Sequence, residues 1–176
     1  MKKLFAILMA LAMLCSLTVS AFAESTEVAA LNWDDVKDAV EGFDGGFKQL
    51  METNLMMWIP DIFEEIELDD SDVEAGIVAY LMTEDQDAAV WFTAYEFDMT
   101  LEELAEELKE EYPDLDFVEI NGVEAIGFTS PDDDVMCVYY MLDDGTALGI
   151  NFTPISDEDY YSLFSVMVCS IQIMED

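Results

Sequence analysis

Between residues 75 and 153, apolar residues recur at every second position or in short runs, and turn residues separate these runs. The segments 75–82 and 88–97 are rich in Val, Ile, Tyr, Phe and Trp, and a polar stretch, 83–87, joins them. A period of two is typical of antiparallel strands, because successive side chains of a strand point to opposite faces. This pattern predicts a β-hairpin and favours a sheet over a helical bundle.

Two further hairpins are predicted from their turns. Asn-Gly and Asp-Gly are preferred where both central residues of a turn take a positive φ. The two pairs and the strands beside them are Asn121-Gly122 between 116–120 and 123–129, and Asp144-Gly145 between 135–142 and 146–153. The segment 135–142 is apolar at almost every position, which is typical of a strand buried on both faces. We therefore expect it at the centre of the sheet.

Three helices are predicted, over residues 33–51, 100–111 and 157–171. In the first, apolar residues recur at intervals of three and four, which places them on one side of a helix. The other two begin with capping boxes, in which an N-cap hydroxyl and an acid three residues later satisfy two backbone N–H groups. These boxes are Thr100 with Glu103 and Ser156 with Asp159.

Together the segments predict one α+β domain over residues 32–176. Its sheet is expected to be largely antiparallel, with about six or seven strands built from three hairpins. A short strand is expected over 54–60, ending at a proline. Residues 24–31 show no periodicity and are expected to be a loose lead-in. A domain of this length buries enough surface to fold without a metal or a disulfide.

The first 23 residues have the three regions of a secretory signal peptide. Lys2 and Lys3 precede an apolar run over 4–14, and small residues at Ala21 and Ala23 fit a cleavage site after Ala23. The alternative is an uncleaved membrane anchor, but polar residues from position 16 onward make the apolar run too short to span a bilayer. The protein is therefore expected to be secreted or associated with the cell surface.

Several short motifs are shared with known proteins, and they are Trp58-Ile59-Pro60, Ser71-Asp72 with Gly76, Thr100 to Leu104, Ile120 to Gly122, Pro154 to Asp157, and Ser170-Ile171. With these motifs the chain resembles an uncharacterised family of small exported proteins from Gram-positive bacteria, and its order of elements resembles the PsbP-like α/β/α sandwich. These motifs are caps, turns and core positions. The resemblance therefore implies a fold and an exported protein, and it implies no activity.

The charge of the chain excludes several classes of function. Acidic residues number 41 against five lysines, and the formal net charge is −36. Nucleic acid is not expected as a partner, because phosphate binding needs clustered basic residues. The sequence contains no histidine, so Ser–His and Cys–His catalysis is excluded. No cofactor motif is present. We therefore expect a monomeric, non-catalytic binding module for a peptide, a protein or a small apolar ligand, with no membrane span after signal cleavage.

Calcium binding is an alternative function. Calcium takes six to eight oxygen ligands, which acidic loops supply. The candidate residues are Asp69, Asp70, Asp72, Glu74, Asp132, Asp133 and Asp134. Their spacing departs from the EF-hand pattern, and solvated turns have the same composition. No metal ligand is assigned from the sequence, and a calcium-responsive surface protein remains open.

A hydrolase that uses two carboxylates is a third hypothesis. Glu119 or Glu124, each in an otherwise apolar strand, could act as the general acid. The same residues also fit the solvent side of an alternating strand. Cys137 and Cys169 could form a disulfide in an exported protein, or they could be separate thiols that pack as small apolar residues. The sequence leaves both of these questions open.

Overall fold

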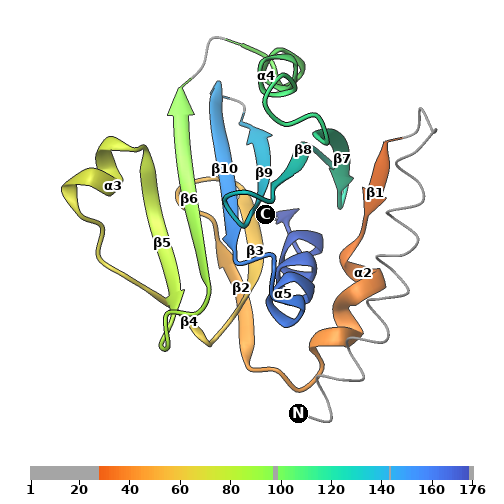
Figure 1. Ribbon diagram of the computed structural model, residues 1–176. Helices are drawn as coiled ribbons and strands as arrows, with labels where there is room; N and C mark the ends of the chain where they lie inside the picture. Colours follow the sequence, from red (N-terminus) through yellow and green to blue (C-terminus); the bar gives the residue numbers. More distant parts are fainter. Residues whose placement is uncertain (1–27, 97–98, 143, 175–176) are drawn as a thin grey trace.

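A computed structural model describes residues 28–96, 99–142 and 144–174, which form two β-sheets and several short helices (Figure 1). The main sheet has eight strands, in the spatial order β1 (Ala29–Leu31), β7 (Asp116–Ile120), β8 (Val123–Ser130), β9 (Val135–Met141), β10 (Thr146–Thr153), β6 (Ala89–Glu96), β5 (Ile77–Thr83) and β4 (Phe63–Glu65). The second sheet has the order β11 (Gln172–Ile173), β3 (Leu55–Pro60) and β2 (Gly45–Gln49). The helices are α2 (Trp33–Val36) with the 3₁₀ helix η1 (Lys37–Val40), α3 (Asp70–Glu74), α4 (Leu101–Leu108) and α5 (Glu158–Cys169).

The three predicted hairpins are confirmed as β5–β6, β7–β8 and β9–β10. The doubly apolar strand β9 is the fourth of the eight strands, which confirms its central place. The main sheet is larger than the six or seven strands expected. Both of its edges consist of three-residue strands, β1 and β4. Strands of three residues are too short to show a period of two in the sequence, so they are recognised only from their pairing with neighbouring strands in the structure.

The expectation of a loose lead-in before residue 32 is wrong for residues 29–31. These residues form β1, which pairs in parallel with β7. All other neighbouring strands are antiparallel. The predicted signal peptide and its cleavage site after Ala23 lie outside the described residues. Within the described residues, no helix is long and apolar enough to cross a membrane.

The predicted helix over 33–51 is wrong beyond Val40, where η1 ends. Residues 45–49 instead form β2, which pairs with β3 in antiparallel register. The apolar residues have helical spacing, but the helix does not continue through them. Gly42 takes a φ of 89°, which is not helical, and the backbone of residues 45–49 pairs with β3 instead. The ring of Trp58 lies against Gly45, where a Cβ would stand 2.7 Å from Cζ2 of that ring.

The capping box of α4 is confirmed. Thr100 Oγ1 accepts a hydrogen bond from Glu103 N, and Glu103 Oε2 accepts one from Thr100 N. The predicted box at Ser156 is wrong. The N-cap of α5 is Asp157, whose Oδ1 accepts hydrogen bonds from two backbone N–H groups of the first turn. The Ser156 hydroxyl donates instead to Asp134 Oδ2, at 2.7 Å. Both helices are also a few residues shorter than expected.

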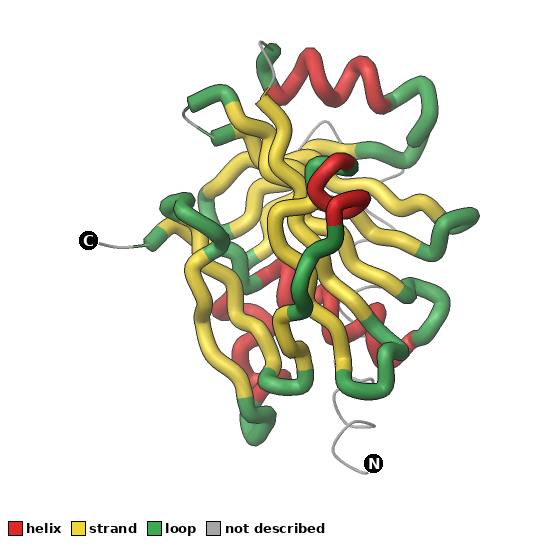
Figure 2. Tube along the Cα trace, turned by 90° about the vertical axis from the view of Figure 1, so that its left-hand side faces the viewer, coloured by secondary structure: helices red, strands yellow, loops and turns green. Residues whose placement is uncertain are grey.

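The main sheet is covered on both faces. Helix α4 packs Leu104 and Ala105 on one face, near Phe128 of β8, and Figure 2 shows it running across one end of the sheet. On the other face lie α5 and the three-stranded sheet, and Phe164 of α5 packs 5.3 Å from Phe152 of β10, between ring centroids. The largest core therefore lies between the main sheet, α5 and β3.

We expect Gly149→Ala to destabilise the fold. A Cβ at this position would lie against Thr93 Oγ1 and 2.8 Å from Tyr139 Cε1, so both side chains would have to move. Overpacking of this kind costs about 1–3 kcal/mol. The matched control is Gly46→Ala, since no atom lies within 4 Å of a Cβ there. Urea unfolding measures both changes, and equal stability of the two variants would contradict the prediction.

Candidate functional site

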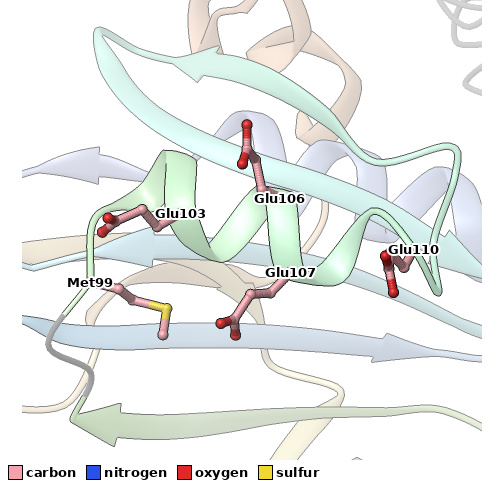
Figure 3. A pocket seen from close by; sticks show the side chains of 5 residues that line it. All are labelled: Met99, Glu103, Glu106, Glu107 and Glu110. Atoms are coloured by element: carbon pink, nitrogen blue, oxygen red, sulfur yellow. The ribbon is translucent and has the colours of Figure 1, made fainter.

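A hollow of about 690 Å³ runs along α4 (Figure 3). We call it the acidic groove. The residues that line it are Met99, Glu103, Glu106, Glu107 and Glu110. Glutamates spaced by three and four residues lie on one side of a helix. Their carboxylates attract cations from solution, but this lining holds no group that would select one cation over another or act as a nucleophile.

A second hollow, of about 330 Å³, lies where the turn between β2 and β3 approaches β6 and β10. We call it the inter-sheet cleft. Its lining residues are Met51, Glu52, Thr53, Asn54, Ala94, Leu142, Asp144, Thr146 and Leu148. Ala94 and Leu148 face each other on neighbouring strands, and Leu148 belongs to the main core. The cleft therefore joins the apolar interior to the surface.

Local backbone geometry positions the rim of the cleft. Met51 has a φ of 56°, which turns the chain sharply between β2 and β3. On the opposite side, Asp144 Oδ1 accepts a hydrogen bond of 2.9 Å from the backbone N–H of Thr146. This bond lowers the pKa of the Asp144 carboxyl below its ordinary value of 3.8. Asp144 therefore presents a fixed negative charge beside apolar walls.

In the first acidic stretch, residues 69–74, the structure assigns a helix-capping role to Asp69 and Asp72. Asp69 is the N-cap of α3, and its Oδ1 accepts hydrogen bonds from Ser71 N and Asp72 N. Asp72 Oδ2 accepts one from Asp69 N, which completes a capping box. The bond from the Ser71 hydroxyl contributes most to lowering the pKa of Asp69. Asp69 Oδ1 and Asp72 Oδ2 therefore already accept hydrogen bonds from within the loop.

In the second acidic stretch, residues 132–134, two side chains stabilise the turn between β8 and β9 by hydrogen bonds. Asp134 has a φ of 61° and accepts hydrogen bonds from Ile155 N, Ser156 N and the Ser156 hydroxyl. Asp133 Oδ2 accepts one from the Ser130 hydroxyl, at 2.7 Å. Across residues 28–96, 99–142 and 144–174, no three or more Asp, Glu or Cys side chains are arranged to hold a metal ion. Specific calcium binding stays a prediction.

The two cysteines lie on opposite sides of the main sheet. Cys137 packs in the cluster formed with α4, whereas the next residue, Val138, packs in the cluster with α5. Cys169 lies on α5 beside Val36 and Val166. The described residues contain no disulfide between them. Burial raises the pKa of the Cys137 thiol to about 12, so this thiol stays protonated and packs as a small apolar side chain.

The candidate general acids Glu119 and Glu124 face each other directly across β7 and β8, and both are exposed. The apolar enclosure that would favour a proton donor at pH 7 is therefore missing from this pair. The inter-sheet cleft was not found from the sequence. Its lining comes from segments almost 100 residues apart, and the only visible signal was the Asp144-Gly145 turn.

No protein-family model and no curated protein sequence matches this chain. The solution structure of cyanobacterial PsbP (CyanoP) from Synechocystis sp. PCC 6803 superposes with a TM-score of 0.53 at 10% identity, covering 74% of this chain and 93% of that one. The fold is PsbP-like. A crystal structure from Bacteroides thetaiotaomicron VPI-5482 has a TM-score of 0.44 at 10% identity, covering 70% of this chain and 46% of that one. At 10% identity the likeness to CyanoP concerns the fold alone.

Proposed function

We propose that this protein is an exported, non-catalytic binding module, one of the small exported Gram-positive proteins that it resembles. Its ligand is a small molecule with an apolar body and a cationic group, bound in the inter-sheet cleft. One observation carries the proposal, which is the fixed carboxylate of Asp144 beside the apolar walls of Leu142 and Leu148. The calcium-responsive and hydrolase hypotheses have no comparable support.

The cleft favours such a ligand for two reasons. Its volume of about 330 Å³ is at the small end of the range for ligand pockets, which suits a compact molecule. Apolar contacts with Met51 and Leu148 favour burial of a hydrocarbon body. A cation at the rim meets Asp144, and the surplus of acidic residues over lysines concentrates cations around the whole molecule.

Binding is favoured over catalysis by the character of the lining. A general acid needs a pKa close to the working pH, whereas the backbone N–H of Thr146 moves the pKa of Asp144 in the opposite direction. The cleft residues named above include no Cys, Ser, Lys or His that would serve as a nucleophile or base. Asp144 is therefore suited to accept a cation.

The test is calorimetric titration of the mature chain with hexylamine and with hexanol, which share a hydrocarbon body and differ in charge. We expect saturable binding of hexylamine and binding of hexanol about ten-fold weaker, the ratio that corresponds to 1.4 kcal/mol. Asp144→Asn keeps an acceptor for Thr146 N and removes the charge, so it should lose this preference. Asp38→Asn, an exposed acid outside the cleft lining, is the control. Non-saturable heats, or an equal effect of both variants, would refute the proposal.

A further inference from the structure

Strand β2 is an edge strand, and no described strand pairs with its second side. It is hydrogen-bonded to β3 on one side and ends the three-stranded sheet on the other. The other strands at the sheet edges, β1, β4 and β11, have two or three residues each, whereas β2 has five. Short edge strands limit unwanted pairing with other chains. Among the described strands, β2 is therefore the edge best able to receive another strand.

The register shows which backbone groups of β2 face outward. Leu50 N donates to Leu55 O at 2.8 Å, and Asp61 N donates to Asp44 O at 3.0 Å. In an antiparallel pair, bonding residues alternate along the strand, so residues 46 and 48 also face β3. The N–H and C=O groups of Gly45, Phe47 and Gln49 then point away from β3. These three residues offer the alternating donors and acceptors that an added strand needs.

Aromatic side chains lie beside this open edge. Phe43 and Phe47 are 38% and 40% exposed, which is high for large apolar residues. The Phe47 ring meets Trp33 edge to face, with 5.4 Å between centroids, and Trp33 stacks on Trp58 at 6.4 Å. Trp58 is buried in the core. Phe47 is thus held on a rigid aromatic base while its own face remains open for contact.

The charge distribution indicates what kind of segment would pair with β2. The strand itself, Gly-Gly-Phe-Lys-Gln, contains no acid, although the chain has 41. The acids Glu41, Asp44 and Glu52 lie just beyond its two ends and are exposed. A segment with an apolar centre and basic ends matches this pattern. A second copy of the chain would instead bring together two molecules of net charge −36.

We propose that β2 binds an extended segment of a partner polypeptide, which adds as a fourth strand to the three-stranded sheet. An apolar side chain of this segment packs on Phe47, and Lys or Arg residues at its ends lie near the acids that flank β2. Backbone bonds to Gly45, Phe47 and Gln49 supply affinity, and the aromatic and acidic side chains supply selectivity. The site shares Glu52 with the lining of the inter-sheet cleft, but its backbone groups and Phe47 lie outside that lining, and it does not depend on the small ligand.

The test uses a fluorescein-labelled peptide, Lys-Val-Thr-Val-Thr-Val-Lys, with the mature chain. We expect saturable anisotropy, and at least ten-fold weaker binding of the peptide in which Glu replaces both Lys. Gln49→Pro removes one outward N–H while leaving the bonds to β3, since proline is tolerated where an edge strand faces solvent. We expect it to weaken binding about ten-fold. Phe47→Ser should have a similar effect.

The matched control is Gln49→Ala, which also loses the side-chain bond from Gln49 Nε2 to Thr53 O but keeps the backbone N–H. Thermal melts establish that all variants are folded before binding is compared. Equal affinity of Gln49→Pro and Gln49→Ala would overturn the proposal, as would equal binding of the Lys and Glu peptides. Sedimentation that shows a dimer which Gln49→Pro dissociates would assign the edge to a second copy and refute a basic partner.

Discussion

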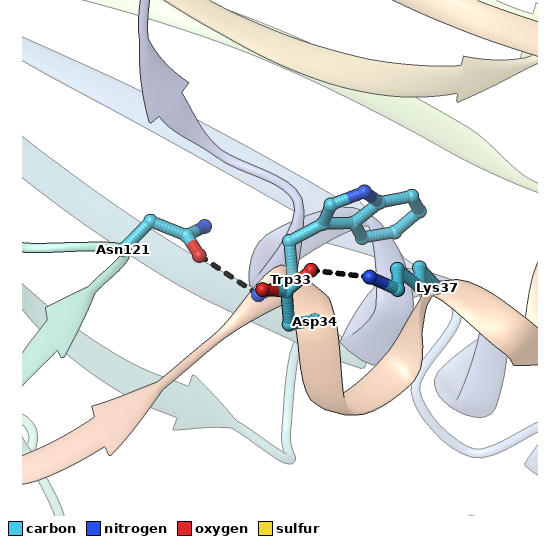
Figure 4. A network of polar contacts seen from close by, with 4 residues as sticks. All are labelled: Trp33, Asp34, Lys37 and Asn121. Carbon is cyan, nitrogen blue, oxygen red and sulfur yellow. Dashed lines mark hydrogen bonds and ion pairs between the residues drawn. The ribbon is translucent and has the colours of Figure 1, made fainter.

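Replacing Asn121 with alanine is expected to lower the free energy of unfolding by about 3 kcal/mol, since three hydrogen bonds of about 1 kcal/mol each are lost. Asn121 Oδ1 accepts from the backbone N–H of Trp33 at 2.8 Å (Figure 4). Its Nδ2 donates to the carbonyl oxygens of Cys169 and Ile171, at 2.8 and 2.7 Å. One side chain in the β7–β8 turn therefore joins the start of α2 to the end of α5.

This loss should lower the melting temperature by roughly 6–12 °C for a chain of this size. Asn121 has a φ of 48°, so part of the effect could come from backbone strain in the alanine variant. Asn121→Gly removes that strain and the side chain together, and we expect it to remain clearly less stable than the wild type. Gln86→Ala is the control, because Gln86 has a φ of 64° in an exposed turn. Destabilisation of Asn121→Ala no greater than that of Gln86→Ala would contradict the prediction.

The second large effect concerns salt. The chain carries a net charge of −36, and the one salt bridge in its described part joins the exposed Lys37 and Asp34 (Figure 4). Folding brings the acids closer together, so repulsion among them opposes the folded state. The screening length falls from about 10 Å at 0.1 M salt to about 3 Å at 1 M. We expect the melting temperature to rise by several degrees over this range of sodium chloride.

Divalent cations should raise the melting temperature further than sodium does at equal ionic strength, because ions that accumulate on the folded surface stabilise the folded state by mass action. The measurement is a series of thermal melts in sodium chloride, magnesium chloride and calcium chloride. Equal effects of magnesium and calcium would indicate general screening, whereas a much larger calcium effect would support the calcium hypothesis. A melting temperature that does not change with salt would contradict the prediction.

Acid should destabilise the fold only at low pH. Among the described residues, five carboxyls have their pKa lowered by hydrogen bonds, and they are Asp69, Asp85, Glu102, Asp134 and Asp144. For Asp134 the main cause is the bond from the Ser156 hydroxyl. The folded pKa lies below the unfolded one, so the unfolded state binds more protons as the pH falls. This stabilisation is complete above the ordinary values of 3.8 and 4.5.

Urea unfolding at pH 7, 5 and 3 tests this. We expect the contribution of these carboxyls to be unchanged between pH 7 and pH 5, and to be lost progressively below about pH 4. Asp134→Asn should be less stable than the wild type at pH 7, with a smaller difference at pH 3. A wild-type stability that already falls steadily from pH 7 to pH 5 would contradict this account.

The parts of the fold that could be predicted from the sequence are those set by local chemistry. The Asn121-Gly122 turn has the predicted positive φ at both residues, 48° and 82°. The capping box of Thr100 needs only residues within one helical turn. The central place of β9 followed from its apolar composition, because a strand with both faces covered needs apolar residues at successive positions.

The errors arose where a distant partner decided between local alternatives. Ser156 was a suitable N-cap, but Asp134, from the turn between β8 and β9, accepts its hydroxyl, and Asp157 caps α5 instead. Residues 45–49 had a helical spacing, but β3 pairs with them. Propensity differences between such alternatives are a fraction of a kcal/mol, which a few tertiary hydrogen bonds exceed.

The sequence by itself therefore determined the hairpins, the class of fold and the overall charge, since each depends on neighbouring residues or on composition. Only the tertiary structure decided where acids and apolar residues meet. The inter-sheet cleft needs Met51 and Leu148 together, and the Asn121 contacts need Trp33 and Cys169 together. A single sequence does not encode such proximities in any local pattern, because they arise from packing two sheets and a helix around one core.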